Sequence, residues 1–323
     1  MRNAKWVKLG HLFNPVDHKL PEGCHDFAQS PQALVFDDFV RIYFSTRLKE
    51  ECSGNYLSHV AFVEFDKSFR NIKRVSDKTI IELGELGTFD EHGIFPFSPF
   101  RHGNQIFAYT TGWSRRVSVS VETSIGLAIS KDNGLSFKKI GSGPVLTSSL
   151  HEPLLVCDGF VKNYNDVFHM WYIYGIGWKK EPDDKLPARV YKIAHATSKD
   201  GTVWEKEEGK QIIPDVLNTN ECQALPSVVK SDGLYHMYFC YRFASDFRKN
   251  SNRGYRLGYA YSENLKDWIR DDENVGIHLS EAGWDSQMMC YPHVFECDSN
   301  IYLLYNGNEF GKYGFGIAIL ERQ

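Results

Sequence analysis

The strongest constraint on the fold is a pattern that this chain of 323 residues repeats five times. Each copy has a polar or acidic lead, then a proline, an apolar run, a short turn and an aromatic run, as in "HDFAQSPQALVFDDFVRIYFSTR" and "NECQALPSVVKSDGLYHMYFCYR". The copies follow one another every 60 to 68 residues, anchored at Pro31, Pro99, Gly159 (in the proline position), Pro226 and Pro292. Self-similarity at this period is typical of repeat architectures.

Each copy predicts a β-hairpin followed by two further strands. Two runs of strand-forming residues flank turn residues, as in "ALVFDDFVRIYFS". A third run follows each hairpin, and after it the chain has "SKDNGLSF" (130–137), "SKDGTVW" (198–204) or "SENLKDW" (262–268). In that motif the Ser and the Asp or Asn can bind backbone amides of a turn, while the aromatic ring is buried between strands. The motif is therefore predicted to be the turn between the third and fourth strands.

The N-terminal segment "AKWVKLGHLF" supplies a strand that the last copy lacks. The fifth copy ends after its third strand, and this segment resembles the fourth strand of the second copy, with Trp6 in the aromatic position. Pairing the two ends of the chain closes a ring that has no unprotected sheet edge. The sequence thus predicts an all-β, five-bladed β-propeller, a single domain over residues 1–323 with four antiparallel strands per blade. A two-sheet sandwich is the alternative.

Composition narrows the classes of function. A formal net charge of −4 argues against nucleic-acid binding, which needs a basic face. The N-terminus lacks the apolar core of a signal peptide, and no apolar run is long enough to span a membrane. The seven Cys are odd in number and contain no C-x-x-C pair, which disfavours a disulfide scaffold or a zinc site. We expect a cytoplasmic protein with no nucleic-acid or membrane partner, no metal and no cofactor, in an oligomeric state that the sequence leaves open.

Two resemblances to known families bear on function. The motif "SKDNGLSF" matches the Asp box of sialidases, S-x-D-x-G-x-x-W/F, but Asp boxes also serve as structural turns in unrelated propellers. Over nearly the whole chain, the five-blade pattern resembles the propeller glycosidases of glycoside hydrolase families 43 and 32 and the mannoside phosphorylases of family 130. This second resemblance implies carboxylates at the channel end of the innermost strands of blades one, three and four. They would serve as general base, pKa-tuning acid and general acid.

Three acidic residues correspond to those positions. Asp158, in "VCDGFVK", immediately precedes the proline position and resembles the blade-three motif. Glu221, in "NECQALP", resembles the acid of blade four, and its Glu-Cys pair is similar to a family 32 motif. In blade one the family has Asp-Pro where this chain has Ser30-Pro31, so the nearest acid is Asp26, placed five residues before its proline as Glu221 is. The resemblance implies Asp26 as the base, Asp158 as the tuning acid and Glu221 as the general acid.

Two carboxylates can together hydrolyse a glycosidic bond. One, kept protonated, assists the leaving group, and the other activates water; a separation of about 6.5–9.5 Å leaves room for that water and gives inversion. Other side chains at the same mouth would hold the sugar, aromatic rings by stacking and Arg by binding hydroxyl or carboxylate groups. The candidates are Arg47, Glu91, His92, Trp113, Glu152, Trp178, Arg242 and Gln287. Each of them could instead pack between blades or hold a turn.

The sequence therefore predicts a glycoside hydrolase-like enzyme that acts on a sugar or oligosaccharide in the central channel by inverting acid–base hydrolysis. Two alternatives stay open. Phosphorolysis would replace water by phosphate and needs a cluster of cationic side chains at the mouth, for which Arg47, Arg242, Arg115 and Arg116 are available. A non-catalytic propeller that binds glycans or acts as a scaffold in polysaccharide metabolism would keep the pocket without the blade-one carboxylate, because fold does not fix function.

Overall fold

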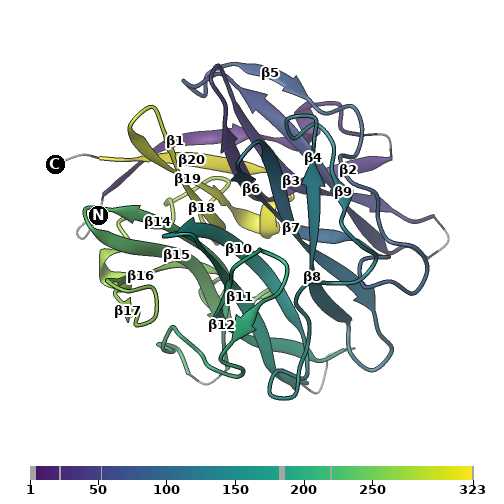
Figure 1. The fold of residues 1–323 in the computed structure, drawn as a ribbon. Helices are drawn as coiled ribbons and strands as arrows, with labels where there is room; N and C mark the ends of the chain where they lie inside the picture. Colours follow the sequence, from purple (N-terminus) through teal and green to yellow (C-terminus); the bar gives the residue numbers. More distant parts are fainter. Residues whose placement is uncertain (1–4, 22, 52, 182–185, 219, 322–323) are drawn as a thin grey trace.

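The computed structural model describes residues 5–21, 23–51, 53–181, 186–218 and 220–321. They form five antiparallel sheets of four strands each, arranged in a ring with the innermost strands β2, β6, β10, β14 and β18 in contact around its centre (Figure 1). Blade one consists of β2 (Cys24–Val35), β3 (Val40–Lys49), β4 (Tyr56–Phe65) and β5 (Ile72–Val75). Blade two consists of β6 (Ile94–His102), β7 (Gln105–Arg115), β8 (Val121–Ser130) and β9 (Lys138–Lys139). Blade three consists of β10 (Val156–Tyr164), β11 (Val167–Lys179), β12 (Ala188–Ser198) and β13 (Glu205–Lys206).

Blade four consists of β14 (Glu221–Ser231), β15 (Leu234–Phe243), β16 (Arg256–Ser262) and β17 (Ile269–Arg270). Blade five consists of β18 (Cys290–Cys297), β19 (Asn300–Asn306), β20 (Phe315–Leu320) and the N-terminal β1 (Trp6–Phe13). The described helical segments are the short 3-10 turns η1 (Pro15–Asp17), η2 (Ser251–Arg253), η3 (Asp272–Asn274) and η4 (Asn308–Gly311). No helix in the described part of the chain has the length and apolar character needed to cross a membrane.

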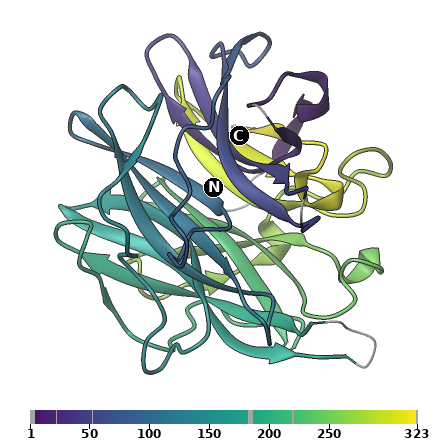
Figure 2. The same ribbon diagram turned by 90° about the vertical axis from the view of Figure 1, so that its right-hand side faces the viewer.

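The two ends of the sequence close the ring, as predicted. Strand β1 pairs antiparallel with β20, so the purple and yellow strands lie side by side in Figures 1 and 2. The innermost strands β2, β6, β10, β14 and β18 each contact the innermost strands of both neighbouring blades. Trp6 is buried, and its indole Nε1 donates a hydrogen bond to the Tyr238 hydroxyl of blade four at 3.1 Å. The closing strand therefore also joins blade five to blade four.

The repeated Ser-Asp motif forms the turn between the third and fourth strands, as predicted. In blade two, Ser130 Oγ accepts a hydrogen bond from the Gly134 N–H at 2.8 Å. Asp132 Oδ1 accepts from the N–H groups of Leu135 at 3.1 Å and Ser136 at 3.0 Å. The turns at 198–204 and 262–268 repeat this arrangement, with an Asp and an Asn as the acceptors. One short side chain thus satisfies amides that the sheet leaves unpaired.

These turns also connect neighbouring blades. The Tyr43 hydroxyl of β3 donates to the Gly134 carbonyl at 2.9 Å, and the Tyr109 hydroxyl of β7 donates to the Gly201 carbonyl at 2.9 Å. Gly134 has a φ of 81° and Gly201 a φ of 77°, in the left-handed region that favours glycine. A Cβ would lie 2.2 Å from the Tyr43 hydroxyl and 2.8 Å from the Tyr109 hydroxyl. The glycine of the motif therefore serves contact between blades as well as the turn.

Replacing Asp132 with alanine tests the structural role of the motif. Because this Asp is exposed to water, we expect the free energy of unfolding to fall by only about 1 kcal/mol, the usual net contribution of a single hydrogen bond. Urea denaturation measures the change, with the exposed Asp77→Ala as the matched control. A loss equal to that of the control would contradict the assignment of Asp132 to the turn.

Each innermost strand bulges at the same place, where two of its residues face one residue of the next strand. The first residues of the bulges are Ser30, Phe95, Asp158, Leu225 and Tyr291. All except Phe95 have a positive φ, between 48° and 59°. A bulge re-aims the side chains of its strand, and bulges are common beside active sites. In this propeller the bulges determine which side chains reach the channel.

Two predictions about the blades need correction. The proline in the blade-two bulge is Pro96; the predicted anchor, Pro99, lies three residues later and pairs with Ala108. The fourth strands are also shorter than predicted, since β9, β13 and β17 have two residues each. A short outer strand exposes few unpaired backbone groups at the sheet edge, which limits edge-to-edge association.

Candidate functional site

A cavity of about 340 Å³ opens where the innermost strands meet the loops at one end of the channel. That volume lies within the usual range of small-molecule sites. All five blades contribute to its wall. The lining residues that the structure describes are Phe27, Gln29, Arg47, Tyr56, Phe95, Trp113, Leu155, Cys157, Asp158, Ile173, Arg189, Tyr191, Ala224, Arg242, Phe247, Arg248, Tyr255, Tyr291 and Phe310.

Asp158 is the one carboxylic acid among the described lining residues. It stands first in the bulge of β10, and its backbone N–H donates to Thr111 Oγ1 at 2.9 Å. Its Oδ2 accepts from the Leu225 N–H at 3.2 Å. Only 7% of the residue is exposed, and this burial raises the pKa of Asp158 to about 7, against the smaller lowering effects of the Leu225 N–H and of Arg189. Its carboxyl group can therefore carry a proton near neutral pH and deliver it to a ligand.

Four guanidinium groups line the same cavity, those of Arg47, Arg189, Arg242 and Arg248. None of them forms an ion pair within 4.0 Å with a carboxylate of the described residues. Burial lowers the pKa of Arg47 to about 10, because no paired carboxylate compensates for the lost hydration. At neutral pH the described lining of the cavity thus holds four positive charges and at most one negative charge.

Neutral groups hold two of the guanidinium groups in place. Arg47 Nε donates to Gln29 Oε1 at 2.9 Å, and its Nη1 donates to Ser58 Oγ at 2.6 Å. Arg242 Nη2 donates to the Tyr191 hydroxyl at 2.9 Å, while its Nε is buried without a hydrogen-bond partner among the described residues. A buried, unpaired donor is costly, and an anionic ligand would relieve that cost.

Aromatic rings surround these cations. The Arg189 guanidinium lies 5.0 Å from the ring centroid of Trp113, and that of Arg242 lies 3.6 Å from the ring centroid of Phe247. Trp113 Nε1 donates to the Phe95 carbonyl at 2.5 Å, which fixes the indole in the wall. The site therefore combines flat aromatic faces with guanidinium groups, and this combination suits a ring-shaped ligand with a negatively charged substituent.

The structure does not bring the three predicted catalytic acids together. Asp26 is partly buried in β2 and is not among the described residues that line the cavity; its carbonyl accepts from Thr46 Oγ1 at 3.0 Å. Asp26 precedes the bulge, and the position that resembles the family's blade-one acid belongs to Ser30, which has no carboxyl group to offer. The roles of base and general acid implied for Asp26 and Glu221 do not fit the positions of these two residues.

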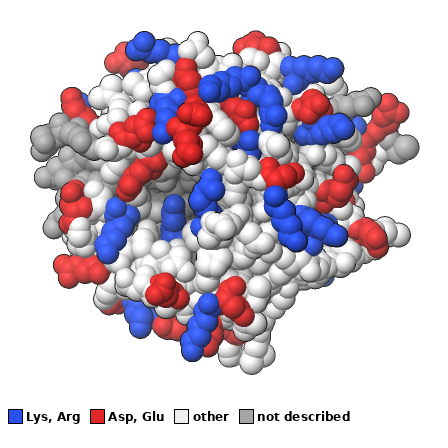
Figure 3. All heavy atoms as spheres, turned by 45° about the horizontal axis from the view of Figure 1, so that its top comes forward, with Lys and Arg blue, Asp and Glu red and all other residues white. Residues whose placement is uncertain are grey.

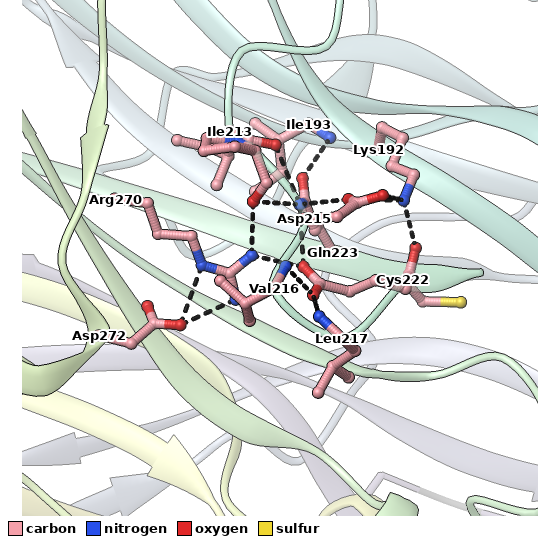
Figure 4. Close-up of polar contacts among 12 residues, drawn as sticks. Lys192, Ile193, Ile213, Asp215, Val216, Leu217, Cys222, Gln223, Arg270 and Asp272 are labelled. Atoms are coloured by element: carbon pink, nitrogen blue, oxygen red, sulfur yellow. Dashed lines mark hydrogen bonds and ion pairs between the residues drawn. The ribbon is translucent and has the colours of Figure 1, made fainter. Parts of the chain in front are cut away.

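Glu221 is fully buried. Its partners Arg270, Val216 and Leu217 belong to a separate polar cluster, which Figure 4 shows. Its Oε1 pairs with Arg270 Nη1 at 2.5 Å, and its Oε2 accepts from the N–H groups of Val216 and Leu217, each at 2.9 Å. Gln223 Nε2 also donates to Oε1, at 3.0 Å. A carboxylate with both oxygens engaged and no exposed surface cannot be reached by a leaving group. Its contacts are those of a structural ion pair.

Of the eight predicted sugar-binding residues, Arg47, Trp113 and Arg242 line the cavity and the other five do not. Glu152 is fully buried, where it pairs with Lys206 at 2.5 Å and accepts from the Tyr172 hydroxyl at 2.9 Å.

The remaining four serve elsewhere in the blades. Glu91 accepts from the Gly87 N–H at 2.8 Å and lies 3.2 Å from His92 Nδ1. Trp178 packs partly buried against the core, and Gln287 is exposed, with its N–H bound to Asn308 Oδ1 at 2.8 Å. These contacts are those of turns and packing, the alternative that the sequence left open.

Several lining residues were not predicted, although the sequence carries a recognisable signal for some of them. Phe95 and Tyr291 stand immediately before the bulge prolines, as Asp158 stands before Gly159, so the internal repeat could have placed them. Arg189 is the second residue of β12 and pairs with Trp178 of β11, whereas Arg248 lies in the loop that follows β15. Both belong to the stretches 177–190 and 242–255, which repeat in no other blade, so an internal comparison could not place their side chains.

Two proteins of one organism are similar to this chain over nearly its whole length. No model of a known protein family matches the chain. Two proteins of Mycobacterium tuberculosis, the uncharacterized protein MT1551 of strain CDC 1551 and the uncharacterized protein Rv1502 of strain H37Rv, are each 32% identical over 322 residues. The match covers 98% of this chain and 99% of each relative. The chain belongs to the family of these proteins.

The Rv1502-family fold is shared with known propeller glycosidases. A thermostable family 43 glycoside hydrolase matches with a TM-score of 0.64 and 14% identity over 94% of this chain and 90% of its own. The family 32 β-fructofuranosidase BmSUC1 of Bombyx mori matches with a TM-score of 0.61 and 15% identity over 95% of this chain and 62% of its own. The β-1,2-mannobiose phosphorylase of Listeria innocua matches with a TM-score of 0.65 and 11% identity over 99% and 97%. The predicted resemblance to these propellers is confirmed for the fold.

Proposed function

We propose that the central cavity binds a saccharide that carries a negatively charged group. The observation that carries the proposal is the placement of four arginines, none ion-paired with a carboxylate of the described residues, around one acid whose pKa burial raises to about 7. Guanidinium groups bind carboxylate and phosphate with two parallel hydrogen bonds, and the surrounding aromatic rings offer stacking faces for a sugar.

The positive charge of the cavity is a local feature. The whole chain has a formal charge of −4, and on the face shown in Figure 3 the acidic and basic side chains are interspersed. A general excess of basic residues therefore does not explain the four arginines. Uncompensated charge of one sign in a recess raises the local concentration of ligands of the opposite sign.

Replacing Arg189 with alanine tests the proposal. We expect the dissociation constant for inorganic phosphate and for glucuronate to rise about 10- to 100-fold, the loss of one charge-assisted hydrogen bond. Isothermal titration calorimetry measures both ligands, with glucose as the neutral comparison and the exposed Arg70→Ala as the matched control for charge. The proposal would be contradicted if the wild type bound glucose and glucuronate with equal affinity, or if Arg189→Ala and Arg70→Ala changed the dissociation constants equally.

A second candidate, phosphorolysis, is favoured by the single carboxyl group. Inverting hydrolysis, the prediction from sequence, needs a second carboxylate to activate water, and the described lining residues contain none besides Asp158. Phosphate needs no base. Held by the arginines, a phosphate oxygen would attack the anomeric carbon while the glycosidic C–O bond breaks and Asp158 gives its proton to the departing oxygen.

The reverse reaction offers a direct assay for phosphorolysis. Incubation with sugar 1-phosphates and acceptor sugars should release inorganic phosphate, and Asp158→Asn should abolish that release because an amide has no proton of suitable acidity to exchange. Phosphate release that survives Asp158→Asn would exclude this mechanism while leaving the binding proposal intact.

A further inference from the structure

A second cavity, of about 270 Å³, adjoins the central one. The two share four lining residues, Arg189, Arg242, Phe247 and Arg248. The rest of the second cavity's described lining comes from Ser120 between β7 and β8, from residues 186–188 at the start of β12, and from the loop that follows β15. Both cavities therefore open onto one partition, and three of its four side chains carry a guanidinium group.

The charge of this pair of cavities is concentrated on the partition. Beyond the shared residues, the described lining of the second cavity contains one acid, Asp246, and one base, Lys249, whose charges cancel. The far side of the central cavity holds Arg47 and Asp158. An anionic group would thus find its strongest attraction between the two cavities, with space on both sides of it.

The partition is built to hold an anion. Arg242 is 3% exposed, and its buried Nε has no hydrogen-bond partner among the described residues. The centre of the Arg248 guanidinium lies 4.8 Å from the ring centroid of Phe247 and 4.9 Å from that of Phe310, and the two rings contact each other edge to face. Contacts with aromatic faces of this kind hold the cation without using its N–H donors.

Resting on the proposed function, we propose that the ligand spans both cavities and carries its anionic group internally, with a substituent on each side. Two kinds of ligand have this chemistry, a monoanionic group with a substituent on each side. One is a phosphodiester between two groups, and the other is a uronic acid within an oligosaccharide. A terminal anion would occupy the partition and leave one cavity without a function. Each cavity alone is near the lower limit of small-molecule sites, whereas the two together accommodate a larger ligand.

Replacing Ala188 with tryptophan tests this inference, because Ala188 lines the second cavity and not the central one. The probes are two pairs: glucose 1-phosphate with its glycerol phosphodiester, and galacturonate with trigalacturonate. We expect the wild type to bind the longer member of at least one pair about 10-fold more tightly. The pair that shows this preference identifies the anion. Ala188→Trp should abolish the preference and leave the shorter member's affinity unchanged, while Ala188→Ser, the matched control, keeps it.

The outcomes separate this inference from the proposed function. Equal binding of the short and long members by the wild type would overturn this inference and leave the proposed function standing. This comparison uses the wild-type protein only, so it does not depend on whether a variant folds. A preference that survives Ala188→Trp would also overturn it. Failure of every anionic probe, inorganic phosphate included, to bind the wild type would overturn the proposed function and the inference with it.

Discussion

Replacing Glu221 with alanine should lower the free energy of unfolding by about 3–5 kcal/mol, the usual cost of removing one partner of a buried ion pair. The substitution leaves the Arg270 guanidinium with Asp272 as its remaining acidic partner, whose Oδ2 accepts from Arg270 Nε at 2.9 Å. It also removes the acceptor of the Val216 and Leu217 N–H groups. The loop before β14 would lose its anchor to the blade.

Urea denaturation measures the expected loss, with Glu207→Ala as the control, since Glu207 forms an exposed ion pair with Lys210. A surface pair of this kind contributes little, about 0–1 kcal/mol. Glu221→Gln adds a second test, because it keeps the shape and loses the charge. If Glu221→Gln unfolded like the wild type yet lost all activity on glycosides, the sequence-based role of Glu221 as general acid would be restored.

The fold was predictable because its determinants are local and repeated. The repeat period, the turn motif and the N-terminal strand with Trp6 can each be recognised from a short segment of the sequence. Closure of the ring then follows from pairing the two ends of the chain. The errors arose where the repeat is imperfect. Blade two offers two prolines, Pro96 and Pro99, and only the register of β6 against β7 decides which one occupies the bulge.

The site was less predictable because a shift of one or two residues in a strand changes which side chains face the channel. Counting back from the proline gave Asp26 and Glu221 as equivalent acids, and both precede the bulge that re-aims the strand. Asp158 was placed correctly in the cavity because it occupies the bulge itself. Arg189 reaches the cavity from the first residues of β12 and Arg248 from the loop after β15, in two stretches that have no counterpart in the other blades and that no internal comparison can align.

Asp158 should make the stability of the protein depend on pH in an unusual direction. Its pKa is raised from 3.8 to about 7 by burial, so between these values the folded protein holds a proton that the unfolded chain has released. The free energy of unfolding therefore falls as pH rises from about 4 to about 7, and the contribution of this proton is fully lost above the folded pKa. The total change attributable to Asp158 is on the order of 4 kcal/mol.

Asp158→Asn isolates this effect, because an amide cannot ionise. Urea denaturation at a series of pH values from 4 to 8 should show the variant gaining stability relative to the wild type as pH rises, whereas the exposed Asp166→Asn should follow the wild type. Anion affinity gives an independent measurement. As Asp158 ionises above pH 7 its charge opposes an anionic ligand, so wild-type binding should weaken there while Asp158→Asn stays flat. Parallel curves for wild type and Asp158→Asn would mean that the Asp158 carboxyl is hydrated and ionised throughout, and the cavity would then lack an acid able to donate a proton near neutral pH.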